Sequence, residues 1–268
     1  FMYRVEAQDI AHSGWEYINP NSFITLSFWC KSSVAQNFNF FVKAQDGTAQ
    51  SFPFETGSLT ANTWTRVIKT IPGNSNLTFQ TDEGEGLRID FPLFYGTNYT
   101  GSTNLNQWNT FSGSTRTPDH TSTWYTTDGA TFEFTGLQLE AGSQATAFEH
   151  RSFGEEMNLC RRYFYMLSSG EQTAPLSGFA YAASNAHVVV NFPVEMRTIP
   201  SYYGVNGTSY FSHIRYGAVD YIDTLALNVA SSKNHMELMA SGNMSNGGYS
   251  GIIRVENTAA RIGFDAEI

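Results

Sequence analysis

The side chains that could do chemistry in this sequence are carboxylates, histidines, cysteines and aromatic rings. The densest acidic run is Asp82-Glu83-Gly84-Glu85, a predicted turn whose oxygens could bind Ca²⁺ or supply half of a glycosidase carboxylate pair. Acidic turns are usually solvated. Glu155-Glu156 is predicted to be the first turn of a helix, where acids complement the helix dipole. Neither group therefore predicts catalysis.

The histidines and cysteines are dispersed. None of the six histidines forms a His-x-x-x-His pair, and the two cysteines form no Cys-x-x-Cys pair. A Gly-x-Ser-x-Gly elbow, a phosphate-binding glycine loop and a dinucleotide fingerprint are also missing from the sequence. Cys30 and Cys160 lie in apolar stretches and are predicted to be small buried residues, although a disulfide between them stays open. We expect no metal, no cofactor and no enzymatic activity.

Aromatic rings are the remaining candidates for function. Sugars present apolar C–H faces flanked by hydroxyls, so lectin sites combine a stacking Trp or Tyr with amide side chains. A polar stretch from about residue 92 to 129 has this composition, and a pair of tyrosines near residue 200 offers a second patch. The candidate glycan ligands are Tyr99, Asn104, Trp108, Tyr202 and Tyr203. The alternative is that these rings pack on their own domain or on a sister subunit.

The charge and aromatic content of the chain limit the classes of partner that it can bind. The chain has 268 residues and a net charge of −9, and only 15% of its residues are charged while 15% are aromatic. The acidic balance argues against nucleic acid, and the sequence has no apolar run of about 18 residues for membrane insertion. A surface of uncharged polar residues is typical of extracellular or virion proteins. The sequence begins at Phe1, without an initiator Met or a signal peptide, so we expect a piece of a longer chain.

Strand patterns dominate the sequence. Short β-branched and aromatic runs with turn residues between them predict an all-β fold, with a jelly-roll or β-sandwich over residues 1–151. The predicted strands are 23–31, 37–43, 63–69, 87–91 and 130–139, and then 187–192, 223–229, 251–255 and 261–268. Ser152 with Glu155 predicts a capping box that starts a connector helix over 152–168. Residues 169–268 are expected to form a second β-sandwich, a tip domain.

Three segments resemble a known module. Residues 130–164 (ATFEFTGLQLEAGSQATAFEHRSFGEEMNLCRRYF), the run from Trp64 to Gly73, and Asn98-Tyr99-Thr100 resemble a module of tailed-bacteriophage virion proteins. This module is a carbohydrate-binding-module-like jelly roll followed by a short helix and a variable C-terminal β-domain. The resemblance covers roughly residues 3 to 165 and supplies no catalytic residue. It implies a tail-fibre or receptor-binding protein at the virion surface, outside the cell, with a longer N-terminal region that contacts other virion proteins.

Two functions from different classes remain open at this point. The first is a non-enzymatic adhesin that attaches to host cell-surface glycans. The second is a purely structural virion component, such as a capsid decoration or a head or tail fibre segment. A glycan-degrading tailspike is disfavoured because such enzymes need long repeats. The resemblance implies a homotrimer, and Met157 and Phe164 are predicted to bury against sister chains.

Overall fold

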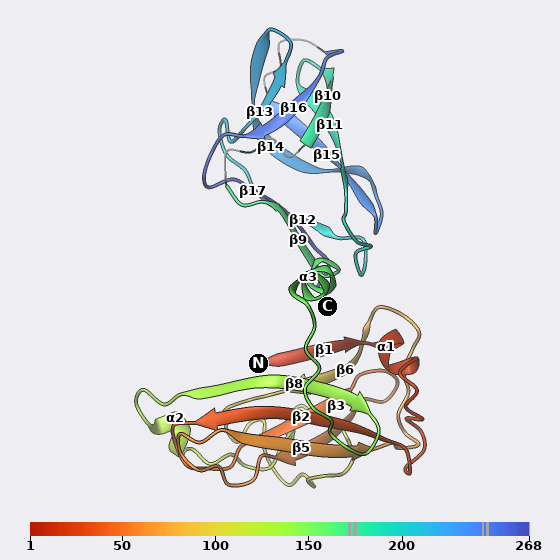
Figure 1. The fold of residues 1–268 in the computed structure, drawn as a ribbon, viewed down its shortest axis with the longest axis vertical. Helices are drawn as coiled ribbons and strands as arrows, with labels where there is room; N and C mark the ends of the chain where they lie inside the picture. The colour runs from red at the N-terminus through yellow and green to blue at the C-terminus, as the bar shows by residue number, and fades with distance from the viewer. Residues whose placement is uncertain (171–172, 174–175, 243, 245–246, 268) are drawn as a thin grey trace. The chain divides into compact units, whose positions relative to one another are not determined.

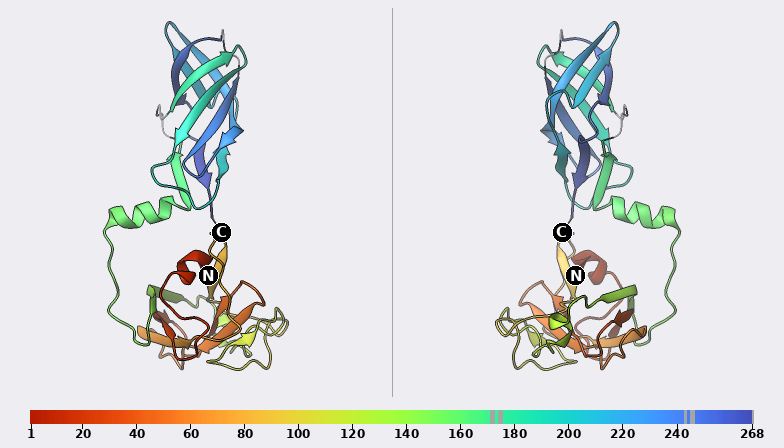
Figure 2. Two further views of the ribbon diagram at one scale, coloured as in Figure 1. Left: turned by 90° about the vertical axis from the view of Figure 1, so that its right-hand side faces the viewer. Right: turned by 90° about the vertical axis from the view of Figure 1, so that its left-hand side faces the viewer.

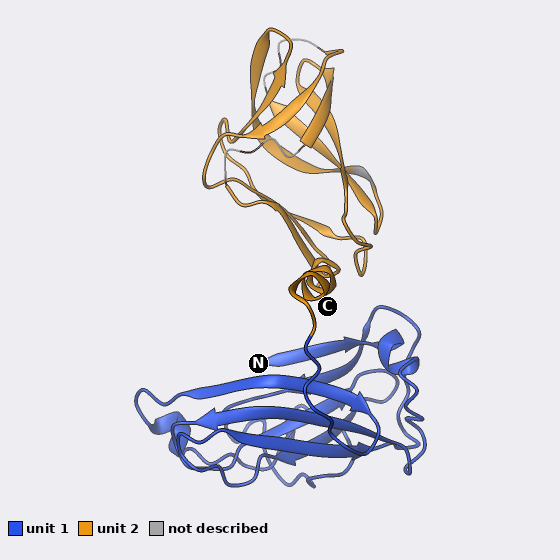
Figure 3. Ribbon diagram, viewed as in Figure 1, with its two compact units in different colours: residues 1–150 blue, residues 151–268 orange. Residues whose placement is uncertain are grey.

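The computed structural model describes residues 1–170, 173, 176–242, 244 and 247–267 (Figure 1). The chain divides into two compact units, Phe1–His150 and Arg151–Ile268 (Figure 3). Both units are built almost entirely of antiparallel strands, which confirms the predicted all-β class. Each unit has its own hydrophobic core.

Unit 1 is a sandwich of two sheets. One sheet has the order β1-β6-β3-β4-β7 and the other has the order β5-β2-β8. The strands are β1 Met2–Glu6, β2 Phe23–Ser32, β3 Asn39–Ala44, β4 Gln50–Glu55, β5 Thr65–Pro72, β6 Glu85–Asp90, β7 Asn109–Thr110 and β8 Phe132–Ala141. Two short helices, α1 (Ala7–Ala11) and α2 (Thr123–Thr126), lie between strands. The strands predicted in this unit from the sequence are all present.

The core of unit 1 follows from alternation along the strands. Leu26, Phe28 and Cys30 of β2 point inward and are fully buried, while Trp29 between them is 42% exposed. β8 is irregular at Gly136, which has a φ of +61° and faces a register shift in β2. The bulge lets β8 continue to pair with β2 on both sides of the irregularity.

A strand that the sequence patterns did not predict is β4. This strand contains Pro53, and proline is disfavoured in a central strand because it cannot donate to a β ladder. In the structure β7 pairs with only Gln50 and Ser51 of β4, so Pro53 lies where this side of the strand has no partner strand. The carbonyl of Pro53 instead accepts a hydrogen bond from the Asn106 amide at 2.7 Å.

Unit 2 starts with helix α3 (Phe153–Arg161). The Ser152 hydroxyl accepts from the Glu155 amide and the Glu155 carboxylate accepts from the Ser152 amide, so the predicted capping box is confirmed. The predicted extent of the helix is wrong, because α3 ends at Arg161 and Phe164–Ser168 is strand β9. The aromatic residues of β9 favour an extended backbone, and β9 pairs with β17 (Arg261–Asp265).

The rest of unit 2 is a closed barrel with a small sheet beside it. The barrel strands are β10 Leu176–Ala182, β11 Asn185–Asn191, β13 Phe211–Arg215, β14 Ala218–Ser231, β15 His235–Gly242 and β16 Ser250–Val255. β12 (Ser201–Val205) joins β17 and β9 in a three-stranded sheet. The sequence predicted a two-sheet sandwich here. Instead β16 pairs with both β10 and β13, which closes the barrel (Figure 2).

Candidate functional site

The outer side of the five-stranded sheet of unit 1 holds the candidate site. Phe40 and Val42 of β3 belong to the core, so Phe41 and Lys43 point to the opposite side of the sheet. Lys43 stands beside Arg88 of β6 in the antiparallel register. This side of a sandwich sheet normally faces water, yet Phe41 is 0% and Lys43 is 8% exposed. Another segment of the chain must therefore cover it.

That cover is the long connection between β6 and β8. The ring centroid of Phe111 lies 6.2 Å from the ring of Phe41 and 4.1 Å from the Lys43 Nζ. The Asn39 side-chain amide donates to the carbonyl of Pro118 at 3.4 Å. These contacts seat the polar stretch on the sheet and carry its aromatic residues to the same face.

One aromatic group in this connection is the tyrosine–arginine stack, made of Tyr95, Tyr99 and Arg116. The guanidinium carbon of Arg116 lies 4.8 Å from the Tyr99 ring centroid and 5.4 Å from that of Tyr95. Its Nη1 donates to the Tyr95 hydroxyl at 3.3 Å and its Nε donates to the Gly113 carbonyl at 3.0 Å. Tyr99 remains 46% exposed, so one part of its ring is free for a ligand.

The stack continues as a row of rings. His120 lies 5.6 Å from Tyr95 and 6.3 Å from Phe94, centroid to centroid. Phe94 in turn stacks on Tyr125 at 4.3 Å with an interplanar angle of 8°. Tyr125 is 64% exposed. The row therefore has an exposed tyrosine at each end.

Hydrogen bonds hold this part of the connection in place. Thr100 and Thr117 form an isolated parallel bridge, and the Thr100 hydroxyl donates to the Asp119 carboxylate at 2.6 Å. The His120 Nε2 lies 2.9 Å from the Thr117 hydroxyl. Burial lowers the pKa of His120, while a hydrogen bond to the Leu93 backbone and the charge of Asp119 act in the opposite direction. The loop is thus fixed by several buried polar contacts.

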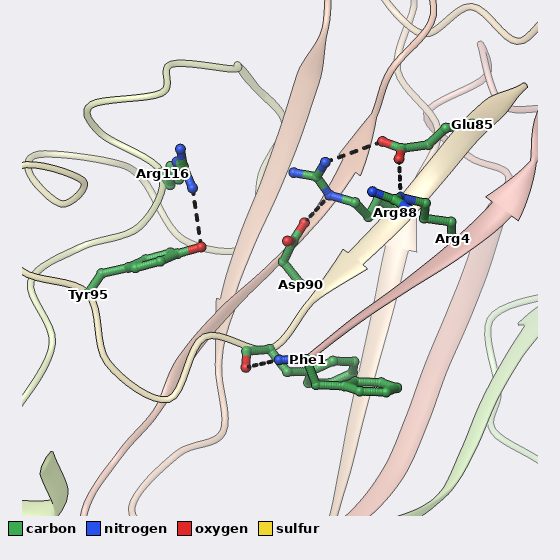
Figure 4. A network of polar contacts seen from close by, with 8 residues as sticks. Phe1, Arg4, Glu85, Arg88, Asp90, Tyr95 and Arg116 are labelled. Atoms are coloured by element: carbon green, nitrogen blue, oxygen red, sulfur yellow. Dashed lines mark hydrogen bonds and ion pairs between the residues drawn. The ribbon is translucent and has the colours of Figure 1, made fainter. Parts of the chain in front are cut away.

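Beside the stack lies the charged patch, made of Arg4, Lys43, Glu85, Arg88 and Asp90. Arg88 Nε donates to Asp90 Oδ2 at 2.7 Å, and its Nη1 lies 3.5 Å from Glu85 Oε1. Glu85 Oε2 is 2.7 Å from Arg4 Nε. Figure 4 shows this chain of ion pairs next to the Tyr95–Arg116 hydrogen bond. Arginines and carboxylates thus alternate across β1 and β6.

The surroundings of Lys43 shift the pKa of its ammonium. Its pKa is lowered, first by burial, which penalises the ammonium, and next by the Arg88 guanidinium. Glu85 and Asp90 raise the pKa in opposition, and Arg116 adds a smaller lowering effect. Lys43 and Arg116 are therefore near enough to interact electrostatically.

The arrangement offers ring faces, a tyrosine hydroxyl and cationic groups side by side. The two carboxylates of the charged patch, Glu85 and Asp90, each already form an ion pair with a guanidinium, so they belong to a chain of ion pairs. Among the residues that the structure describes, no cluster of three or more His, Cys, Asp or Glu could hold a metal ion. These groups suit the binding of a hydroxylated or anionic molecule by stacking and hydrogen bonding.

The sequence-predicted ligands of unit 1 fall in different places. Tyr99 belongs to the stack. Trp108 is half-buried, with its ring 5.5 Å from Phe52 and its Nε1 donating to the Pro72 carbonyl at 2.7 Å, so it closes the edge of the core. Asn104 is exposed, and its backbone carbonyl accepts from the Asn109 side chain at 3.0 Å. The structure does not bring Trp108 into the stack.

The second predicted patch is divided between the two faces of β12. Tyr202 packs on the core of unit 2 with its ring 6.1 Å from Phe264, and burial raises the pKa of its hydroxyl above the ordinary value. Tyr203 points the other way, is 50% exposed and meets Phe164 edge-on at 5.6 Å. Adjacent residues of a strand alternate, so these tyrosines share no surface.

The remaining predicted positions lie in unit 2 and in the acidic turn. Met157 and Phe164 are both half-buried. Cys30 is buried as predicted, but Cys160 is exposed, because α3 buries none of its residues, and both thiols are free. In the acidic turn, Asp82 Oδ1 accepts from the Gly84 amide at 2.9 Å, which is a local turn contact.

Sequence reasoning missed Lys43, Arg88 and Arg116, and it did not select Tyr95, one of the rings of the polar stretch, as a ligand. A signal existed for Lys43 and Arg88, because each is a charged residue at an alternate position of an otherwise apolar strand. Arg116 and Tyr95 are distant in the sequence, and only the fold of the connection places them together.

No model of a known protein family matches this sequence, and none of the curated proteins compared with it is significantly similar. Among the described residues, no helix is long and apolar enough to cross a membrane.

Proposed function

We propose that this chain is a virion surface protein of a tailed bacteriophage, of the tail-fibre or receptor-binding type, that attaches to host cell-surface glycans without catalysis. The ligand binds the outer side of the five-stranded sheet, against the tyrosine–arginine stack. One observation carries the proposal: Tyr99 presents a half-exposed ring whose position is fixed by the guanidinium of Arg116. The sequence resemblance to phage virion modules supplies the biological setting.

A fixed ring favours sugar binding. An immobile platform loses little conformational entropy when a ligand stacks on it, so more of the contact energy appears as affinity. Arg116 is itself held by Gly113 and Tyr95, and the loop beneath it is held by Thr100 and Asp119. The tyrosine–arginine stack is therefore preorganised for ligand binding.

The chain is also proposed to form a homotrimer. Helix α3 has no buried residue, and Phe153 and Leu159 are 79% and 45% exposed. Phe153, Met157 and Cys160 recur at helical spacing, which gives α3 an apolar stripe. Sister helices would cover such a stripe. Sedimentation velocity at micromolar concentration tests this, and a monomer would contradict it.

The test of attachment is binding of the purified chain to a glycan array and to whole host cells. Wild type should bind saturably, and Tyr99→Ala should lose that binding while keeping its melting temperature. Tyr203→Ala is the matched control, because Tyr203 is exposed to a similar degree but lies in unit 2. Equal loss in both variants would place the ligand elsewhere.

Absence of binding by folded wild type would favour the second candidate, a structural virion component. The observation behind that candidate is the exposed apolar stripe of α3, which suits assembly. Under that outcome Tyr99→Ala would leave particle assembly unchanged, whereas Phe153→Ser would impair it.

A further inference from the structure

Lys43 is an unusual cation for the outer side of a sheet. The residue is only 8% exposed, and its ammonium lies over the ring of Phe111. Within the described part of the chain, no carboxylate or other acceptor hydrogen-bonds to this ammonium. Buried lysines are almost always paired with an anion, because removing an ammonium from water is costly. Its cation–π contact offsets only part of that cost.

The neighbouring carboxylates are already engaged. Asp90 accepts from Arg88, and Glu85 is shared between Arg88 and Arg4. Asp119 is held by Thr100 and acts on His120. Within the described part of the chain none of these anions forms a direct ion pair with Lys43, and Glu85 and Asp90 act on it only at longer range.

Arg116 is the second cation without a carboxylate. Among the described residues its hydrogen bonds go to the carbonyl of Gly113 and the hydroxyl of Tyr95, and its Nη2 has no acceptor. Four cations, Arg4, Lys43, Arg88 and Arg116, thus share the surface with three anions, Glu85, Asp90 and Asp119. These groups together have an excess of one positive charge in a chain whose net charge is −9.

We propose that this face selects acidic glycans, and that an anionic group on the sugar binds between Lys43 and Arg116 while the ring of the sugar stacks on Tyr99. This inference rests on the proposed function and narrows it to a substrate class. An anion at this position supplies the partner that Lys43 lacks and an acceptor for Arg116 Nη2. Charge-assisted hydrogen bonds of this kind are stronger than neutral ones.

The shared chemistry is an anion on a sugar, which could be a carboxylate of a uronic or nonulosonic acid or a phosphate substituent. The experiment uses an array that carries alginate, polygalacturonate and polysialic acid, each beside its carboxyl-reduced form, together with phosphate-substituted and neutral glycans. We expect affinity for an acidic member to exceed that for its neutral counterpart by about tenfold or more. Raising NaCl should weaken this preference.

Variants locate the anion. Lys43→Met should weaken binding of the acidic glycan about tenfold more than binding of its neutral counterpart. Arg116→Gln should lower the ratio of acidic to neutral affinity in the same direction, while weakening both because Arg116 also fixes the Tyr99 ring. Lys31→Met is the matched control: Lys31 also lies over a ring, that of Trp64, but on the other sheet and paired with Glu133 at 2.8 Å. Arg116 is only half-buried, so Arg116→Gln tests the proposal if Lys43→Met fails to fold.

The outcomes separate the two proposals. Equal binding of acidic and carboxyl-reduced glycans, with Tyr99→Ala still defective, would overturn the acidic preference and leave the attachment function standing. An acidic preference that Lys43→Met and Arg116→Gln both retain would also overturn this inference. Absence of all glycan and cell binding would overturn both proposals.

Discussion

The guanidinium carbon of Arg116 lies 4.8 Å from the centroid of the Tyr99 ring. Tyr99, which the sequence predicts as a sugar ligand, thus packs against Arg116, which the sequence does not predict as part of a site. The contact gives Arg116 two roles, since it fixes the ring and also leaves Nη2 free for a ligand.

Arg116→Lys separates these two roles. Lysine keeps the charge but lacks the planar fork that stacks on Tyr99 and donates to Gly113 and Tyr95. We expect affinity for the preferred glycan to fall about threefold to tenfold, less than for Arg116→Gln, with a change in unfolding free energy below about 1 kcal/mol. Isothermal titration and thermal unfolding measure these quantities. Unchanged affinity would show that the stack geometry is not used.

Tyr202→Phe tests the placement of the second predicted patch. The Tyr202 hydroxyl is buried without a hydrogen-bond partner among the described residues, so its removal should leave stability equal or raise it by about 1 kcal/mol. Glycan binding should not change. Chemical denaturation gives the free energy, and a loss of more than about 1 kcal/mol would reveal a hidden partner.

The pH dependence of stability gives a second test of the burial of Tyr202. Because burial raises the pKa of Tyr202, the hydroxyl stays protonated in the folded state above its ordinary value of 10.0, while it ionises in the unfolded state. The folded state then holds the extra proton, so this group lowers stability as the pH rises above about 10. Tyr202→Phe should show a smaller loss of stability over that range than wild type.

Local patterns sufficed where one side of a strand meets the core. The alternation in Phe132-Glu133-Phe134 predicts β8, and the Ser152–Glu155 spacing predicts the start of α3, because both depend on neighbours in the sequence. β15 was not predicted, since Met236, Glu237 and Leu238 are good helix formers. Its pairing with β11 and β14 makes it a strand.

The candidate site was only partly predictable, because its contacts join residues that are distant in the sequence. Tyr99 was found from composition, but its partner Arg116 is set by the Thr100–Thr117 bridge, which no local pattern encodes. Trp108 was predicted to bind sugar because it lies among amide side chains in the sequence. A tryptophan that packs at the edge of a core can have the same neighbours, so the sequence does not distinguish the two roles. Its hydrogen bond to the Pro72 carbonyl shows that it completes the core edge instead.

The two thiols should differ in reactivity and in their effect on stability. Cys160 is exposed in the single chain and should react with a thiol reagent in the folded monomer, more slowly where sister helices cover α3. Cys30 should react only after unfolding. Burial raises the pKa of Cys30 from 9.0 to about 11, so the folded state holds this proton over a range where the unfolded state loses it. Stability should therefore fall as the pH rises between 9.0 and about 11.

Cys30→Val removes this titration while keeping an apolar side chain of similar size. Its stability should depend less on pH between 9.0 and about 11 than that of wild type, measured by urea unfolding at several pH values. Cys160→Val is the control and should follow wild type. Parallel curves for wild type and Cys30→Val would contradict the assignment.

The barrel of unit 2 contains a buried imidazole. His213 is 0% exposed, and neither ring nitrogen has a hydrogen-bond partner among the described residues. It points into the barrel beside Gly251, where an added Cβ would lie 2.6 Å from the His213 Nε2 and 2.3 Å from the Ile214 carbonyl oxygen. A buried polar group without partners costs about 1–3 kcal/mol, so His213→Leu should raise the unfolding free energy.

Gly251→Ala should lower the unfolding free energy, because the new methyl group meets backbone. His235→Leu on β15 is the control for a change of histidine to leucine, since His235 is exposed, and it should stay within about 0.5 kcal/mol of wild type. Urea unfolding of the three variants measures these differences. Destabilisation by His213→Leu beyond about 1 kcal/mol would show that the imidazole has a partner inside the barrel.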